Sequence, residues 1–173
     1  SLCLLLCGRV SGRLLALGFT KTIERVMSAS DLCITKPGGL STSECLALGL
    51  PIHLIHGNNV GDTQALHRQS RASGGLLEYH GADARLELGG RRIFVVHYDD
   101  YGLAFACTGD WALVCCGHSH KAEARKLTGV NGKQTWLVNP GTVAGLAAPA
   151  TWALGDLEAM RFEICALNAS ISA

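Results

Sequence analysis

The sequence lacks any long run of basic residues: no stretch of Lys and Arg is longer than Arg91-Arg92. Its 15 basic and 14 acidic residues leave a formal net charge of only +1. A protein that binds nucleic acid or a membrane surface through bulk electrostatics usually carries a basic patch or a large net charge. The composition therefore argues against a nucleic-acid polymer or a membrane as the partner.

Marks of secretion are also missing from the sequence. The apolar start, Ser1–Cys7, is too short to span a bilayer, and no charged leader of a signal peptide precedes it. No pair among the eight cysteines has the Cys-x-x-Cys spacing of a zinc knuckle or a redox motif, and most of them stand in apolar runs. We therefore expect reduced thiols and a cytoplasmic protein.

What the sequence does have is enough apolar content for one compact domain, since 48% of its 173 residues are hydrophobic. Over residues 2–51, short apolar strands alternate with helices, which is typical of a parallel α/β layer. Ser41 or Thr42 can cap the second helix, and Gly49 can end it. The elements predicted here are strands over 2–7 and 31–35 and helices over 20–28 and about 42–48.

From residue 52 onward, strands predominate. Gly89-Gly90 lies between two of them and favours a tight hairpin turn. The predicted elements are strands over 52–55, 84–88, 92–97, 112–116, 135–138, 151–156 and 160–165, with a helix over 63–73. The whole chain is therefore expected to be an α/β protein with mixed sheet layers and helices.

Several apolar strands end in side chains that can bind a metal. Ligands of open α/β sheets sit at the carboxyl ends of strands, and imidazole nitrogens and amide oxygens suit divalent metals. Each segment alone has a common structural explanation, because a lone strand-end histidine is usually structural and Asn-Pro-Gly is usually a turn. The candidates are Asn58 and Asn59 after 52–55, His97 after 93–96, His118 and His120 after 113–116, and Asn139 after 137–138.

In their order along the chain, these segments resemble the calcineurin-like metallophosphoesterases, especially their small bacterial phosphodiesterase branch. The resemblance runs from about residue 52 to residue 167. The matching segments are Gly57-Asn58-Asn59, the strand-end His97, Gly117–His120 and Asn139–Thr142.

This resemblance implies a metal-dependent phosphodiesterase that acts on a small phosphodiester substrate. It implies that Asn58, His97 and His118 ligate one metal and that His120 ligates the other. Asn59 stands where many members have a catalytic histidine, and we expect Asn59 and His120 to be the catalytic residues. The expected cofactor is one or two divalent transition-metal ions, Mn, Zn or Fe.

The family's first two motifs, Asp-x-His and Gly-Asp-x-x-Asp, do not occur before Asn58. Those motifs supply the bridging carboxylate and the rest of the first metal site. The site can therefore be mononuclear, can use Asp62, Asp99 or Asp100 instead, or can be completed by a second chain. The alternative function is a catalytically dead fold that binds metal or nucleotide.

The first 51 residues resemble instead the nucleotide-sugar domain of MurG-like and glycolipid glycosyltransferases. The segments that carry this resemblance are 18–20, 27–31 and 35–44. In that family, the residues matching Gly38, Gly39, Ser41 and Thr42 hold a nucleotide diphosphate, and the one matching Glu44 holds the ribose.

We therefore expect a chimera: a half phosphoesterase sandwich over 52–173 plus two β-α units over 1–51, joined in one compact unit. The fragment is too short to transfer sugar, so a scaffold role is expected; the alternative is that the Gly38-Gly39 loop still binds a phosphate. A truncated sheet leaves an open edge, and edges are usually paired or covered, so a homodimer is expected.

Overall fold

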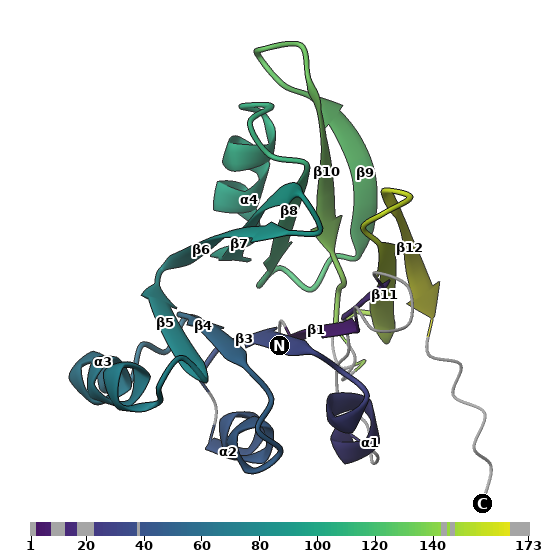
Figure 1. The fold of residues 1–173 in the computed structure, drawn as a ribbon. Coiled ribbons are helices and arrows are strands. Elements are labelled where there is room, and N and C mark those ends of the chain that lie inside the picture. Colours follow the sequence, from purple (N-terminus) through teal and green to yellow (C-terminus); the bar gives the residue numbers. More distant parts are fainter. Residues whose placement is uncertain are drawn as a thin grey trace, which may run out of the picture.

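The computed structural model describes residues 3–7, 13–16, 23–37, 39–142, 145 and 148–166. In this part of the chain, two sheets face each other, and helices cover their outer sides (Figure 1). Helices α1 (Ile23–Ser28), α2 (Gly39–Ala47) and α3 (Thr63–Ala72) lie beside the larger sheet, and α4 (Asp99–Ala106) lies beside the smaller one. The expected α/β fold with mixed sheet layers is confirmed.

The larger sheet joins strands from both ends of the sequence in the order β12-β11-β2-β1-β3-β4-β5. Strands β3, β4 and β5 are parallel, whereas β1 is antiparallel to both β2 and β3. The parallel arrangement predicted for the first strand and β3 was therefore wrong, because β2 follows β1 as its antiparallel neighbour and reverses the chain before β3. The strands are β1 (Cys3–Cys7), β2 (Arg13–Ala16), β3 (Leu32–Thr35), β4 (Ile52–Ile55), β5 (Leu77–Gly81), β11 (Thr151–Asp156) and β12 (Arg161–Ala166).

The smaller sheet has the order β6-β7-β8-β10-β9. Gly89 and Gly90, with φ of 57° and 68°, form the predicted hairpin turn between β6 and β7. Strands β7, β8 and β10 are parallel, so their carboxyl ends meet at one edge. The strands are β6 (Asp83–Leu88), β7 (Arg91–Tyr98), β8 (Leu113–Gly117), β9 (Glu123–Thr128) and β10 (Gln134–Asn139).

Three apolar clusters hold these layers together. The central one lies between the sheets and includes Ile34 and Ile55 from the larger sheet and Val95 from the smaller one. A second cluster lies between the larger sheet and its helices, and a third lies around Phe94, between the smaller sheet and α4. Each fully buried aliphatic or aromatic side chain contributes roughly 1.5–3 kcal/mol. The central cluster therefore fixes how the strand ends of the two sheets face each other.

The sequence predicted the end of helix α2 correctly but not its beginning. The helix begins at Gly39, so Ser41 and Thr42 lie inside it and the prediction that either caps it was wrong. Gly38, on the same loop, lies outside the described residues. At the other end, Gly49 has φ of 66°, and the Leu50 N–H donates to the Cys45 carbonyl over 2.9 Å. That bond is typical of a glycine-terminated helix, and it confirms the predicted end.

Several cysteines are thiols, as expected. Cys115 and Cys116 lie buried in β8, where burial raises the pKa of both and brings that of Cys116 to about 12. Both are therefore protonated, poorly reactive core residues. Cys107 is also a thiol, but it is exposed. None of the described helices has the length and apolarity that crossing a bilayer requires.

Candidate metal centre and active site

Two histidines meet at the carboxyl ends of neighbouring parallel strands. His97 stands near the end of β7, and His118 directly follows β8. Nε2 of His97 lies 3.2 Å from Nδ1 of His118. The loop after β4 reaches the same place, since a Cβ added to Gly57 would stand 3.8 Å from Cε1 of His97. The two sheets thus present their strand ends to one site.

His97 is held in the form that a metal requires. Its side chain is buried, and its Nδ1 has no hydrogen-bond partner within the described part of the chain. Burial, followed by the charges of Lys36, His118 and His120, lowers the pKa of His97 to about 4. The ring is therefore neutral at physiological pH and keeps a lone pair available for a ligand.

The loop that carries His118 and His120 has an unusual backbone. Both histidines are left-handed, with φ of 66° and 59°, a conformation that residues other than glycine rarely adopt. Asn139 braces the loop: its side-chain nitrogen donates to the Gly117 carbonyl over 3.1 Å and to Ser119 Oγ over 3.2 Å. Asn139 is therefore a structural residue of the site, while the strained backbone is typical of a functional loop.

Lys36 is a member of the site that the sequence did not predict. It follows β3, the parallel neighbour of β4, and its side chain runs across Gly57. A Cβ on Gly57 would stand 2.8 Å from Lys36 Cδ and 3.6 Å from Lys36 Nζ. Its ammonium group is the largest charge acting on His97. The signal that could have found Lys36 is its position at the end of a buried strand, which the other candidates share.

A cavity of about 430 Å³ opens beside these residues, large enough for a small ligand. Tyr98 joins the cavity to the histidines, because its ring centroid lies 5.0 Å from that of His97 and 4.7 Å from that of His118. Asn58 lines the cavity, whereas Asn59 is exposed to solvent and is not among the described residues that line it. The residues that line it include His56, Gly57, Asn58, Tyr98 and Tyr101.

The carboxylates suggested as replacements for the missing motifs do not complete the site. Asp62 caps helix α3, where its Oδ1 accepts a hydrogen bond from the Ala65 N–H over 2.9 Å. Asp99 and Asp100 lie in the first turn of α4, where the helix dipole favours acidic side chains. Within the described residues, no carboxylate forms a three-residue ligand group with His97 and His118.

These residues fit one transition-metal ion better than two. Two imidazoles that face each other, with an amide oxygen on the adjoining loop, offer nitrogen and oxygen ligands. A second ion is disfavoured, because the described residues supply no bridging carboxylate and Lys36 already places a positive charge beside His97.

Comparison with known proteins now adds to this geometry. A family model described as the calcineurin-like phosphoesterase superfamily domain matches residues 12–160. The chain belongs to this superfamily. Because the match begins at residue 12, it includes β2 and β3 and gives no support to a glycosyltransferase fragment that ends near residue 51. No curated protein matches the sequence.

Solved structures share the fold of this phosphoesterase. One, described as a novel archaeal phosphodiesterase, is 20% identical over 75% of this chain and 77% of that chain, with a TM-score of 0.57. A mutant of Vps29 from Entamoeba histolytica is 15% identical over 87% and 91% of the two chains, with a TM-score of 0.51. Vacuolar protein sorting 29 from Cryptosporidium parvum is 17% identical over 87% and 88%, with a TM-score of 0.50. At these identities the likeness shows the fold alone.

Proposed function

We propose that this phosphoesterase is a metal-dependent phosphodiesterase that hydrolyses small phosphodiesters, cyclic nucleotides among them. The observation that carries the proposal is the His97–His118 pair, with nitrogens 3.2 Å apart, one ring buried and neutral, and a cavity beside them. The archaeal structure described as a phosphodiesterase shares this fold, so the fold is compatible with the proposed reaction.

In this proposal, His97 and His118 hold one Mn, Zn or Fe ion, Asn58 adds an amide oxygen, and His120 lies close by as a catalytic residue. A divalent ion supplies a Lewis acid that polarises a phosphoryl oxygen and lowers the pKa of water. Asn59 donates a hydrogen bond from its side-chain amide to a non-bridging phosphoryl oxygen. Tyr98 packs against the His118 ring and keeps it oriented.

The charge of the site favours a diester over a monoester. A phosphodiester carries one negative charge, whereas a monoester carries nearly two at neutral pH, and stabilising the extra charge takes additional cationic groups. Lys36 lies beside His97, and Lys121 follows His120 in the chain. With one metal ion and few other cations, the site matches the less charged substrate.

The second candidate function is an anion-binding fold without hydrolysis. Lys36 favours it, because an ammonium group beside His97 attracts a phosphate and opposes a metal cation. In that case phosphate would bind without any added metal, and no diester would be cleaved.

The test combines metal content with hydrolysis of a bis-aryl phosphodiester for the wild type and His118→Ala. His118 is exposed, so its removal should leave the fold intact; His67→Ala, an exposed histidine on α3, is the matched control. We expect His118→Ala to bind one ion fewer and to lose about 100-fold in turnover, the upper end of the cost of mutating a residue that only hydrogen-bonds a metal ligand. Equal metal content and turnover in the wild type and His118→Ala would contradict the proposal.

We also propose that the chain before Pro51 is scaffold, despite its resemblance to glycosyltransferases, and that the protein forms a homodimer through this part. Strands β1–β3 lie in the same sheet as β4 and β5, so they complete the phosphoesterase layer. At the end of α2, Leu46 and Leu48 are 37% and 46% exposed, an apolar surface suited to association. A monomer by light scattering at micromolar concentration would contradict the dimer.

A further inference from the structure

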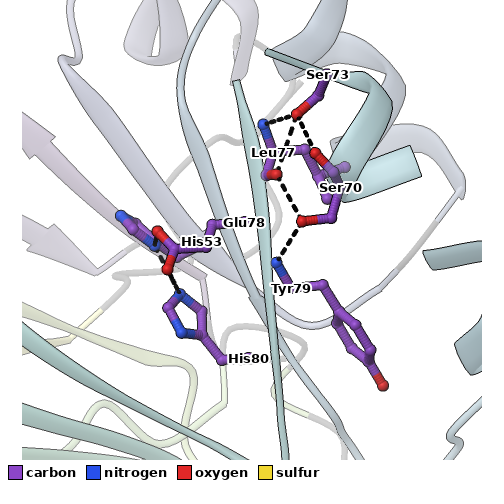
Figure 2. Close-up of polar contacts among 7 residues, drawn as sticks. All are labelled: His53, Ser70, Ser73, Leu77, Glu78, Tyr79 and His80. Atoms are coloured by element: carbon purple, nitrogen blue, oxygen red, sulfur yellow. Dashed lines mark hydrogen bonds and ion pairs between the residues drawn. The ribbon is translucent and has the colours of Figure 1, made fainter. Parts of the chain in front are cut away.

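A second group of metal-binding side chains lies within the larger sheet, on β4 and β5. His53 of β4 stands directly opposite Glu78 of β5, and His80 lies two residues further along β5. Because alternate residues of a strand point to the same face, Glu78 and His80 lie on one face of the sheet, and His53 lies on that face too. Figure 2 shows the three side chains turned toward one another. Their ligand atoms all lie within 4.8 Å of one another.

The backbone that carries Glu78 and His80 is firmly held. Leu77 and Tyr79 are buried in the cluster under the helices, which fixes the intervening residues on the opposite face. The outer edge of β5 is bonded by helix α3 (Figure 2): Ser70 Oγ donates to the Leu77 carbonyl over 3.0 Å, and the Leu77 N–H donates to Ser73 Oγ over 3.0 Å. These hydrogen bonds fix the backbone of this edge strand, and with it the directions in which its side chains point.

The distances place two imidazoles and one carboxylate around a common point. Nδ1 of His53 lies 2.7 Å from Nε2 of His80. The two carboxylate oxygens of Glu78 lie 3.3 Å from Nδ1 of His53 and 3.9 Å from Nε2 of His80. The side chains of His53 and His80 are only 18% and 13% exposed, whereas Glu78 is 60% exposed. The cluster is therefore open to solvent on the carboxylate side.

The charges of this cluster attract a cation. Burial lowers the pKa of both His53 and His80, despite the opposing effect of the Glu78 carboxylate on each. Both rings are thus neutral at physiological pH, and the cluster carries one net negative charge.

We propose that His53, Glu78 and His80 form a divalent-metal site, suited to Zn²⁺ or a similar transition metal and separate from the strand-end histidines. Two imidazoles and one carboxylate are ligands that zinc accepts, and they leave a fourth position open. With bonds of about 2.0–2.2 Å, two ligands of a tetrahedral ion stand about 3.4 Å apart. The pair at 2.7 Å would have to open by about 0.7 Å on binding, within reach of side-chain rotation.

An ion in this place would connect β4 to β5 by bonds from both strands. It would thereby stabilise the edge of the sheet just before the loop that carries Gly57, since the two strands also meet where the His56 N–H donates to the Gly81 carbonyl over 2.6 Å. Stabilisation by a bound ion grows with its concentration relative to Kd, so added metal should raise the thermal midpoint.

The experiment is a titration with Co²⁺, followed by visible absorption, and with Zn²⁺, followed by thermal midpoint. It is made on the 173-residue protein carrying His118→Ala, which removes the strand-end site and makes the outcome independent of the proposed phosphodiesterase. Glu78→Gln and His80→Gln are compared with Glu87→Gln, a matched carboxylate change on an exposed residue of β6.

We expect the Glu87→Gln protein to bind one Co²⁺ with the spectrum of a four-coordinate ion and to gain in thermal midpoint with Zn²⁺. Glu78→Gln should weaken binding by at least the roughly 10–100-fold that is lost when a residue supporting a metal ligand is mutated, and His80→Gln should weaken it further. Glu78 is largely exposed, so its variant keeps the fold even if His80→Gln does not. Unchanged affinity in Glu78→Gln, or no binding in Glu87→Gln, would overturn the site.

Discussion

The two histidine clusters of this phosphoesterase differ in charge and in backbone. His97 and His118 stand at strand ends, beside a left-handed loop, a cavity and the ammonium group of Lys36. His53 and His80 stand inside regular strands, next to the carboxylate of Glu78. The Lys36 ammonium group makes the first cluster positive, and the Glu78 carboxylate makes the second negative. A positive, open cluster suits a phosphate substrate, whereas a negative, clamped cluster suits a metal that stabilises the fold.

The largest effect should come from giving the strand-end cluster a carboxylate. Lys36→Asp replaces a positive charge by a negative one, and one unit charge at 4 Å is worth about 1–4 kcal/mol between a fully aqueous and a near-surface dielectric. We therefore expect Mn²⁺ to bind the strand-end site roughly 5–700-fold more tightly, since about 1.4 kcal/mol corresponds to a tenfold change.

Mn²⁺ titration of Lys36→Asp in a Glu78→Gln background measures this change without a contribution from the second cluster. Lys133→Asp, an equal charge change on an exposed turn, is the control. Equal affinity in the Lys36 and Lys133 variants would show that Lys36 does not govern the site.

A smaller loss of activity should follow from Asn59→Ala. If the amide donates to a charged phosphoryl oxygen, removing it costs about 1.5–3 kcal/mol, or roughly 10–100-fold in kcat for the diester. Metal content should stay the same, because Asn59 is not a proposed ligand. Asn58→Ala should instead lower metal affinity. Normal kcat in Asn59→Ala would remove this residue from the catalytic group.

A still smaller effect, steric in origin, is expected at Gly57, where the loop after β4 approaches Lys36. The Cβ of Gly57→Ala would stand 2.8 Å from Lys36 Cδ, so the lysine side chain must shift away from Gly57. Because that side chain is flexible, we expect only a few-fold change in turnover and a loss of about 1 kcal/mol in stability. Adding Lys36→Ala to Gly57→Ala should restore the lost stability. Thermal melts of the wild type, the two single variants and the double variant measure this effect.

The smallest effect is expected at Glu44, which the glycosyltransferase resemblance marks as a ribose-binding residue. Glu44 lies on α2, within the proposed scaffold. We expect Glu44→Ala to keep diester turnover within a few-fold of the wild type. A large fall in turnover at an unchanged thermal midpoint would show that this loop has been recruited into the active site.

Much of the fold could be predicted from the sequence, but four elements could not. The apolar runs predicted β3, β4 and β8, and Gly89-Gly90 predicted the hairpin, because burial and turn chemistry are local properties. Strand β9 was missed because Glu123–Thr128 is polar and half-exposed, so its pairing with β10 leaves no apolar run. Helix α4 was missed because its eight residues, Asp99–Ala106, are too few for a clear helical period. Strands β2 and β5, with four and five residues, are similarly short and were not predicted.

The site shows the same division between local and long-range information. The strand-end rule correctly placed His97 near His118, since parallel neighbouring strands end at one edge. It could not show that Asn139 braces the loop or that Asp62 caps a helix, because both depend on hydrogen bonds made in the folded chain. The second cluster was missed because His53 and Glu78 are far apart in sequence and are joined only by the pairing of β4 with β5.

The most direct test of the central claim, metal-dependent diester hydrolysis, is a comparison of specificity constants with added Mn²⁺. A bis-aryl phosphodiester, a 2′,3′-cyclic nucleotide and an aryl phosphomonoester are assayed with the wild-type protein, with and without the metal. We predict metal-dependent cleavage of both diesters, with higher kcat/KM than for the monoester. A higher kcat/KM for the monoester would contradict the diester assignment, and no metal-dependent cleavage of any substrate would favour the anion-binding fold.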